Sequence, residues 1–225
     1  MIPFKDDNPT RHLPIITIAL ITANLAVFIF ESLFISDHQE LAYAYGAMPH
    51  SLLTFDVIQP VHPFVTIFTS MFMHGGLLHL GSNMLYLWIF GNNIEDKLGH
   101  VKFIIFYILC GVIAAYTHAF ANPASTVPMI GASGAVSGIL GAYILLFPHA
   151  RIHTLVFFIF FVQVIKLPAI IVIGFWIGIQ LINGVISQGS SIHGGIAWFA
   201  HIGGFIFGIL IIKFFVKNKR GHSFH

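Results

Sequence analysis

Residues 131–147 read GASGAVSGILGAYILLF, an apolar run without a charged residue. A run of this length and composition is typical of a membrane-spanning helix. The whole chain agrees, because 57% of its 225 residues are hydrophobic and only 8% are charged. Soluble domains carry about 25% charged residues, so we expect lipid to be the main solvent. The net charge of +2 and the lack of a basic stretch interleaved with aromatics argue against a nucleic-acid partner.

The rest of the chain contains more runs of this kind. Besides 131–147, the expected spans are about Leu13–Phe34, Phe64–Phe90, Phe103–Ala121, Leu167–Ser187 and Gly194–Phe215. The apolar stretch Thr154–Ile165 is too short to span, and we interpret it as an interfacial or re-entrant link. We therefore predict an all-α membrane protein with a six-transmembrane-helix bundle. A head of residues 1–12 precedes a six-span domain of residues 13–216, and a basic tail of residues 217–225 follows.

The distribution of Lys and Arg predicts the orientation of this bundle. The segments after the first, third and fifth expected spans contain neither residue type, so every Lys and Arg lies in the other segments. Cytoplasmic segments are enriched in Lys and Arg, so both termini should be cytoplasmic. No small-residue cleavage site follows the first apolar run, which indicates a cytoplasmic head rather than a signal peptide. This favours an integral multi-pass protein of the bacterial cytoplasmic membrane.

Polar side chains within the spans are candidates for function, because lipid disfavours them. Counted from the cytoplasmic ends at about 1.5 Å per residue, His79, Asn83, Ser133 and His201 all fall in the outer half of the bilayer at similar depth. His74 belongs to the same expected second span. Three helices would therefore bring a hydroxyl, two imidazoles and an amide to one layer.

These residue types suit acyl transfer. A serine hydroxyl needs a base to take its proton, and His201 is the candidate base for Ser133. No Asp or Glu lies in the middle of a span, which predicts a Ser-His dyad rather than a triad. His79 and Asn83 share one helix face and, with the Ser133 backbone N–H in the first turn of its helix, provide donors for an oxyanion.

Each residue also has a plainer interpretation. A serine among Gly and Ala often serves close helix packing, a buried His is often only a hydrogen-bonding group, and Asn83 alone is typical of interhelical contacts. We interpret Gly204 and Gly208 as packing residues that let the sixth span approach the fourth. A His cluster is also compatible with a metal site, but the spacing matches no common zinc pattern. We expect neither a metal nor a cofactor.

The sequence resembles the rhomboid family of intramembrane serine proteases over roughly residues 60–215. The matching stretches are HGGLLHLGSN at 74–83, FGNNIEDKLG at 90–99, GASGA at 131–135, and AHIGG at 200–204 followed by Gly208. The stretches at 74–83, 131–135 and 200–208 are three motifs in the family's order and on the expected spans, and 90–99 resembles the family's linker after the second span. One departure is Ser137, which stands where some relatives carry an aromatic residue that stacks on the catalytic His.

The resemblance implies a rhomboid bundle around a water-filled cavity open to the outer side. It implies an endopeptidase that cuts transmembrane helices of client proteins near the outer boundary through an acyl-enzyme. Ser133 would be the nucleophile and His201 the general base. His79, Asn83 and the Ser133 backbone N–H would form the oxyanion hole. Supporting positions would be His74, Gly131, Gly134, Gly204 and Gly208.

Two other classes of function stay open. A silent rhomboid-like protein would bind membrane clients without cutting them, but such proteins typically lack the Ser or the His. A transporter or channel would have polar residues along a path through both leaflets. Here the polar residues stop in one half, which fits a blind cavity better. The partners expected are transmembrane substrates and the lipid bilayer.

Overall fold

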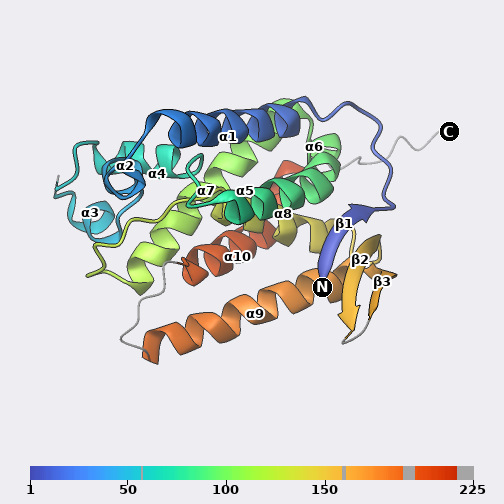
Figure 1. The fold of residues 1–225 in the computed structure, drawn as a ribbon. Coiled ribbons are helices and arrows are strands. Elements are labelled where there is room, and N and C mark those ends of the chain that lie inside the picture. Colours follow the sequence, from blue (N-terminus) through green and yellow to red (C-terminus); the bar gives the residue numbers. More distant parts are fainter. Residues whose placement is uncertain (57, 159–160, 190–195, 217–225) are drawn as a thin grey trace.

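The computed structural model describes residues 1–56, 58–158, 161–189 and 196–216. The long helices α1 (Ile15–Phe34), α7 (His100–Ala121), α9 (Ala169–Gly189) and α10 (Trp198–Phe215) form most of the bundle, and a small sheet lies at one end (Figure 1). These four helices are long and apolar enough to cross a membrane. The protein is therefore a multi-pass membrane protein. The predicted basic tail, from residue 217 onward, lies outside the described residues.

The other two predicted spans are also helical. The second is continuous from Leu77 to Leu98 in three pieces, which are α5 (Leu77–Tyr86), a π-helical turn η1 (Leu87–Gly91) and α6 (Asn92–Leu98). The fourth is α8 (Ser133–Leu146). At about 1.5 Å per residue α8 is only about 21 Å long, shorter than a bilayer core of roughly 30 Å. The six-span count and the cytoplasmic termini remain predictions.

The prediction for the second span was wrong at both ends. Its expected start, Phe64, lies in a separate short helix α4 (Pro63–Ser70), and residues 71–76 form a turn before α5. The paired glycines Gly75 and Gly76 favour this break, because glycine is a poor helix former. His74 is consequently in the turn and not in the span. The predicted outer loop 35–63 contains two short helices, α2 (His38–Tyr45) and α3 (Pro49–Thr54).

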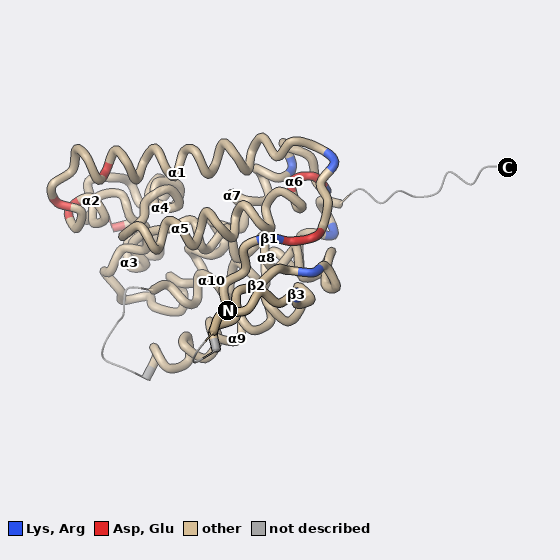
Figure 2. Tube along the Cα trace, turned by 45° about the vertical axis from the view of Figure 1, so that its right-hand side comes forward, with Lys and Arg blue, Asp and Glu red and all other residues tan. Residues whose placement is uncertain are grey.

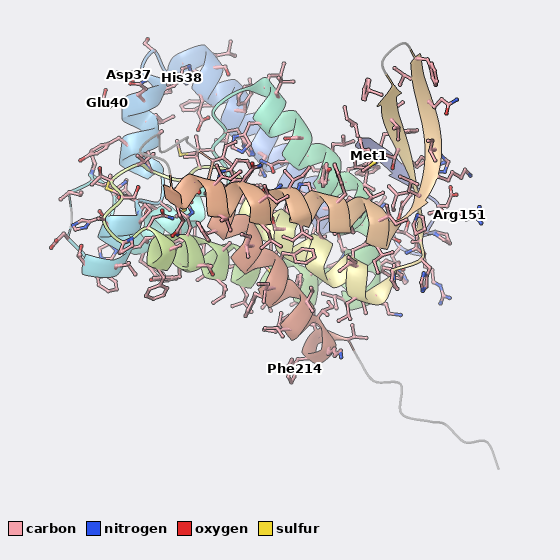
Figure 3. All side chains as sticks on the ribbon, turned by 90° about the horizontal axis from the view of Figure 1, so that it is seen from below. Met1, Asp37, His38, Glu40, Arg151 and Phe214 are labelled. Atoms are coloured by element: carbon pink, nitrogen blue, oxygen red, sulfur yellow. The ribbon has the colours of Figure 1, made fainter. Side chains whose placement is uncertain are left out.

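The prediction of an all-α protein was also wrong. β1 (Ile2–Asp6) pairs antiparallel with β2 (Arg151–Phe158), which pairs antiparallel with β3 (Phe161–Pro168). The link predicted to be interfacial or re-entrant is thus a β-hairpin. It projects to one side of the helices, with Arg151 at its base and Met1 nearby (Figure 3). Its many β-branched and aromatic residues favour strands, and the pairing satisfies backbone groups that a short apolar coil would leave open.

The sheet ties the head of the chain to the helices. Asp6 accepts hydrogen bonds from Tyr143 Oη of α8 and from Asn93 Nδ2 of α6, both at 2.7 Å. Asp7 accepts from His153 at 2.6 Å and from Lys166 at 3.1 Å, and these bonds lower the pKa of its carboxyl. Lys and Arg gather at this end of the bundle (Figure 2).

A buried carboxylate from another helix caps the N-terminus of α1. Glu95 of α6 accepts hydrogen bonds from the backbone N–H groups of Ile16 and Thr17 at 2.8 Å and from the Thr17 hydroxyl at 2.7 Å. Pro14, the residue before α1, supplies no side-chain cap. A carboxylate at a helix N-terminus satisfies open donors and is favoured by the helix dipole. Glu95 lies beyond Phe90, the predicted end of the second span, so this contact joins the added turns of that helix to α1.

Helix α8 is the centre of the bundle, and every residue from Ala135 to Tyr143 is buried. It packs against α10 through glycines on both helices. A side chain at Gly204 would collide with the carbonyl oxygen of Gly134, and one at Gly208 with that of Gly138. The two backbones therefore approach as closely as small-residue helix pairs in membranes do.

This contact gives a stability prediction. We expect Gly204→Ala to lower the free energy of unfolding by about 1–3 kcal/mol, because its methyl group meets backbone that cannot give way. The control is Gly174→Ala in α9, where an added methyl group would have open space. Thermal unfolding in detergent measures both. Equal melting temperatures for the two variants would show that the backbones of α8 and α10 do not pack so closely that only glycine fits between them.

Candidate active site

Two predicted residues meet where α8 begins beside α10. Ser133 is the first residue of α8, and His201 lies in the first turn of α10. The Ser133 Oγ is 2.7 Å from His201 Nε2, a hydrogen bond between residues 68 positions apart in the chain. The glycine contact described above brings the two helices close enough for it. A hydroxyl hydrogen-bonded to an imidazole nitrogen has the geometry of a nucleophile and its base.

The candidate oxyanion donors on α5, His79 and Asn83, lie close to the start of α8. Residue 131 lies just before α8, with a φ of +121°, and a side chain there would come within 2.8 Å of the His79 ring and 3.6 Å of Asn83 Nδ2. Glycine alone suits this backbone conformation at so close an approach. Asn83 is buried, and its amide nitrogen has no hydrogen-bond partner among the described residues. A buried donor without a partner costs free energy unless a ligand or water satisfies it.

The start of α8 adds backbone donors. Ala132, the residue before it, offers no side-chain cap. The first N–H groups of a helix have no partner within the helix and carry partial positive charge. His79, Asn83 and these N–H groups can thus surround a single oxygen next to the Ser133 hydroxyl.

A cavity of about 830 Å³ joins these groups. Its walls come from α5, α8, α9 and α10, and they include His79, Asn83, Ser133 and His201. Among the described residues that line it, none is Asp, Glu, Lys or Arg. The cavity is large enough for several side chains of an extended peptide, and its few polar groups converge on Ser133.

The remaining predicted residues lie around this cavity. His74 is buried in the turn before α5, and its ring packs edge-on against the His79 ring with centroids 5.0 Å apart. A side chain at Gly134 would meet Ala114 and Ala200, and Gly204 and Gly208 form the α8–α10 contact. Within the described residues, no group of three or more His, Cys, Asp or Glu side chains is arranged to hold a metal ion.

The residues that orient the His201 ring were not predicted from the sequence. Gln180 Oε1 of α9 lies 2.7 Å from His201 Nδ1. The rings of Trp176 and Trp198 pack on His201 with centroid distances of 5.9 and 6.3 Å. Ser137 is buried, and its hydroxyl donates to the carbonyl oxygen of Ser133. The available signal was an amide, Gln180, in the middle of an apolar span.

Comparison with known proteins agrees with the motifs. The sequence model of the rhomboid domain matches residues 62–218. The chain belongs to the rhomboid family. This confirms the resemblance seen in the sequence. The match covers the elements that build the cavity, from α4 through α10.

Several curated rhomboid proteins align with the chain. Rhomboid protein 1, mitochondrial, of Saccharomyces cerevisiae is 32% identical over 151 residues, 65% of this chain and 40% of that protein. Presenilin-associated rhomboid-like protein, mitochondrial, of Mus musculus is 31% identical over 150 residues, covering 64% and 36%. Rhomboid protease GluP of Bacillus subtilis is 31% identical over 107 residues, covering 48% and 19%.

These alignments cover two fifths or less of each relative's length. The names of two of the three place them in mitochondria, and one relative comes from a bacterium. The comparisons therefore do not support the prediction of a bacterial cytoplasmic membrane. They support a multi-pass membrane protein of this family.

Proposed function

We propose that the chain is a serine endopeptidase that cleaves transmembrane helices of client proteins. The observation that carries the proposal is the 2.7 Å contact between Ser133 Oγ and His201 Nε2, made in a cavity where the Asn83 amide is unpartnered. Membership of a family that includes a named protease supports it. Ser133 is the nucleophile, and His201 is the general base.

The proposed reaction has two halves. His201 Nε2 takes the proton of the Ser133 hydroxyl as Oγ bonds to the carbonyl carbon of the scissile peptide. The oxyanion that forms is stabilised by His79, Asn83 and the Ser133 backbone N–H. The C–N bond then breaks, the protonated imidazole gives its proton to the leaving amine, and an ester to Ser133 remains. Water, deprotonated by His201, hydrolyses this ester and restores the serine.

The place of cleavage follows from the short helix α8. If its end near Leu146 lies at the inner boundary, Ser133 lies several ångströms inside the outer boundary, since α8 is shorter than the bilayer core. A client helix must unwind there to expose a peptide carbonyl. Unwound backbone costs several kcal/mol per unsatisfied group in lipid, but a wet, protein-lined cavity can satisfy it.

The client would enter between α5 and α9. Both helices contribute to the cavity lining, with Leu77 and Leu78 on α5 and Trp176 and Gln180 on α9. Leu77 and Leu78 are exposed, as expected for a rim that meets lipid or substrate. Lateral entry at this rim lets the client stay in the membrane until it unwinds.

A pair of clients tests the unwinding step. Wild-type protein in proteoliposomes is given a single-span client with Gly, Ala, Ser or Pro in the outer part of its span, and a matched client with only Leu there. We expect cleavage of the first between small residues and at least about tenfold slower cleavage of the second, because Gly and Pro weaken a helix. Equal rates would contradict the unwinding step. Cleavage of the first client in its water-exposed part would contradict the site of action.

A further inference from the structure

A hydrogen bond from α9 determines which nitrogen of the His201 ring carries the proton. Gln180 Oε1 lies 2.7 Å from His201 Nδ1, and an amide oxygen can only accept. The orientation of this amide is itself determined, because Gln180 Nε2 donates to the Trp176 carbonyl oxygen at 3.3 Å. A flipped amide would set its oxygen against that carbonyl oxygen, so two acceptors would face each other. In this orientation the amide oxygen can accept a hydrogen bond only from a protonated Nδ1.

We propose that Gln180 is a positioning residue that holds His201 as the base, an inference that rests on the proposed function. In a neutral imidazole only one nitrogen is protonated. With the proton held on Nδ1, Nε2 keeps its lone pair 2.7 Å from the Ser133 hydroxyl. In the other tautomer Nε2 would carry a hydrogen and could not accept the serine proton.

Gln180 thus takes the place that an aspartate has in a Ser-His-Asp triad, where the acid orients the ring and stabilises its charged form. None of the described residues that line the cavity is acidic. An ionised carboxylate at membrane depth is costly, whereas a neutral amide costs less. Gln180 is buried, with 6% of its surface exposed, so water competes little for the bond. The amide provides orientation and tautomer selection, and it stabilises the imidazolium less than a carboxylate would.

The position of Gln180 links three helices into one chain of hydrogen bonds. Ser133 belongs to α8, His201 to α10 and Gln180 to α9. Trp176, one turn before Gln180, also contacts the His201 ring. The orientation of the base therefore depends on α9 lying against α10, and α9 is also one side of the proposed entry.

Three substitutions in full-length protein test the role. Gln180→Leu removes the acceptor at similar size, and Gln180→Glu keeps the length and an acceptor oxygen. Asn183→Leu removes a half-buried amide one turn further along α9 and serves as the matched control. We expect Gln180→Leu to lower kcat about 10- to 100-fold, part of the usual effect of a general base, with KM nearly unchanged. Gln180→Glu should recover most of kcat, and Asn183→Leu should match wild type.

A spectroscopic measurement separates positioning from a general effect on folding. In ¹⁵N-histidine NMR, the His201 signal is identified by its loss in His201→Ala. We expect an Nδ1-protonated neutral ring in wild type and a shift toward the Nε2-protonated tautomer in Gln180→Leu. An unchanged tautomer in Gln180→Leu, or full activity of that variant, would overturn the role of Gln180. If Ser133→Ala is inactive in the same assay, the proposed function still stands. Active Ser133→Ala would instead overturn the proposed function.

Discussion

Ser133→Ala and His201→Ala are each expected to lower client cleavage by more than about 10⁴-fold, because neither half of a nucleophile–base pair works alone. The 2.7 Å contact between Ser133 Oγ and His201 Nε2 is the reason to treat them as one unit. Cleavage of a single-span client by purified protein in proteoliposomes measures the loss.

The double variant separates a shared mechanism from two independent roles. If the residues act as one unit, Ser133→Ala/His201→Ala should be no slower than either single variant. Ser133→Ala exchanges only a hydroxyl group for a hydrogen atom, so its melting temperature should stay close to wild type. Measurable turnover by Ser133→Ala would contradict the assignment of Ser133 as the nucleophile. Losses that add in the double variant would show that His201 does not act through Ser133.

Asn83→Ala is expected to lower kcat by about 10²–10³-fold, the usual effect of losing one oxyanion donor. The motivation is that the Asn83 amide nitrogen is buried without a partner among the described residues, beside Gly131 and the His79 ring. His79→Ala should act in the same direction. Neither change should abolish cleavage, because the backbone N–H groups at the start of α8 remain.

The measurement is kcat and KM for the same client. Loss of a hydrogen-bond donor to the oxyanion lowers kcat with little change in KM, whereas weaker client binding raises KM. Asn183→Ala again controls for the loss of an amide at membrane depth. Wild-type kcat in both Asn83→Ala and His79→Ala would place the oxyanion donors elsewhere in the cavity.

Much of the bundle could be predicted from the sequence, because apolar length and composition dominate in a membrane chain. The predicted spans Leu13–Phe34 and Phe103–Ala121 differ from α1 and α7 by three residues or fewer at either end. Candidate site residues could be chosen from the sequence because a polar group in an apolar run stands out, and their similar depth suggested one layer. The structure places Ser133 and His201 in contact and sets His79 and Asn83 beside them.

What could not be predicted depends on contacts between distant segments. The hairpin of β2 and β3 reads as an apolar stretch, and its strands are defined by their pairing with each other and with residues 2–6. The second span extends to Leu98, and its added part carries Glu95, which meets the start of α1 across about 80 residues. Gln180 has no neighbouring motif, and its role depends on a helix–helix contact with His201.

Covalent labelling of the serine tests the central claim most directly. A fluorophosphonate reacts with a serine only where a base activates it, so peptide mass mapping after labelling identifies the activated hydroxyl. The account predicts one adduct on Ser133 in wild type, with labelling lost in His201→Ala and in denatured protein. An adduct on another serine, or no adduct on protein that cleaves its client, would contradict it.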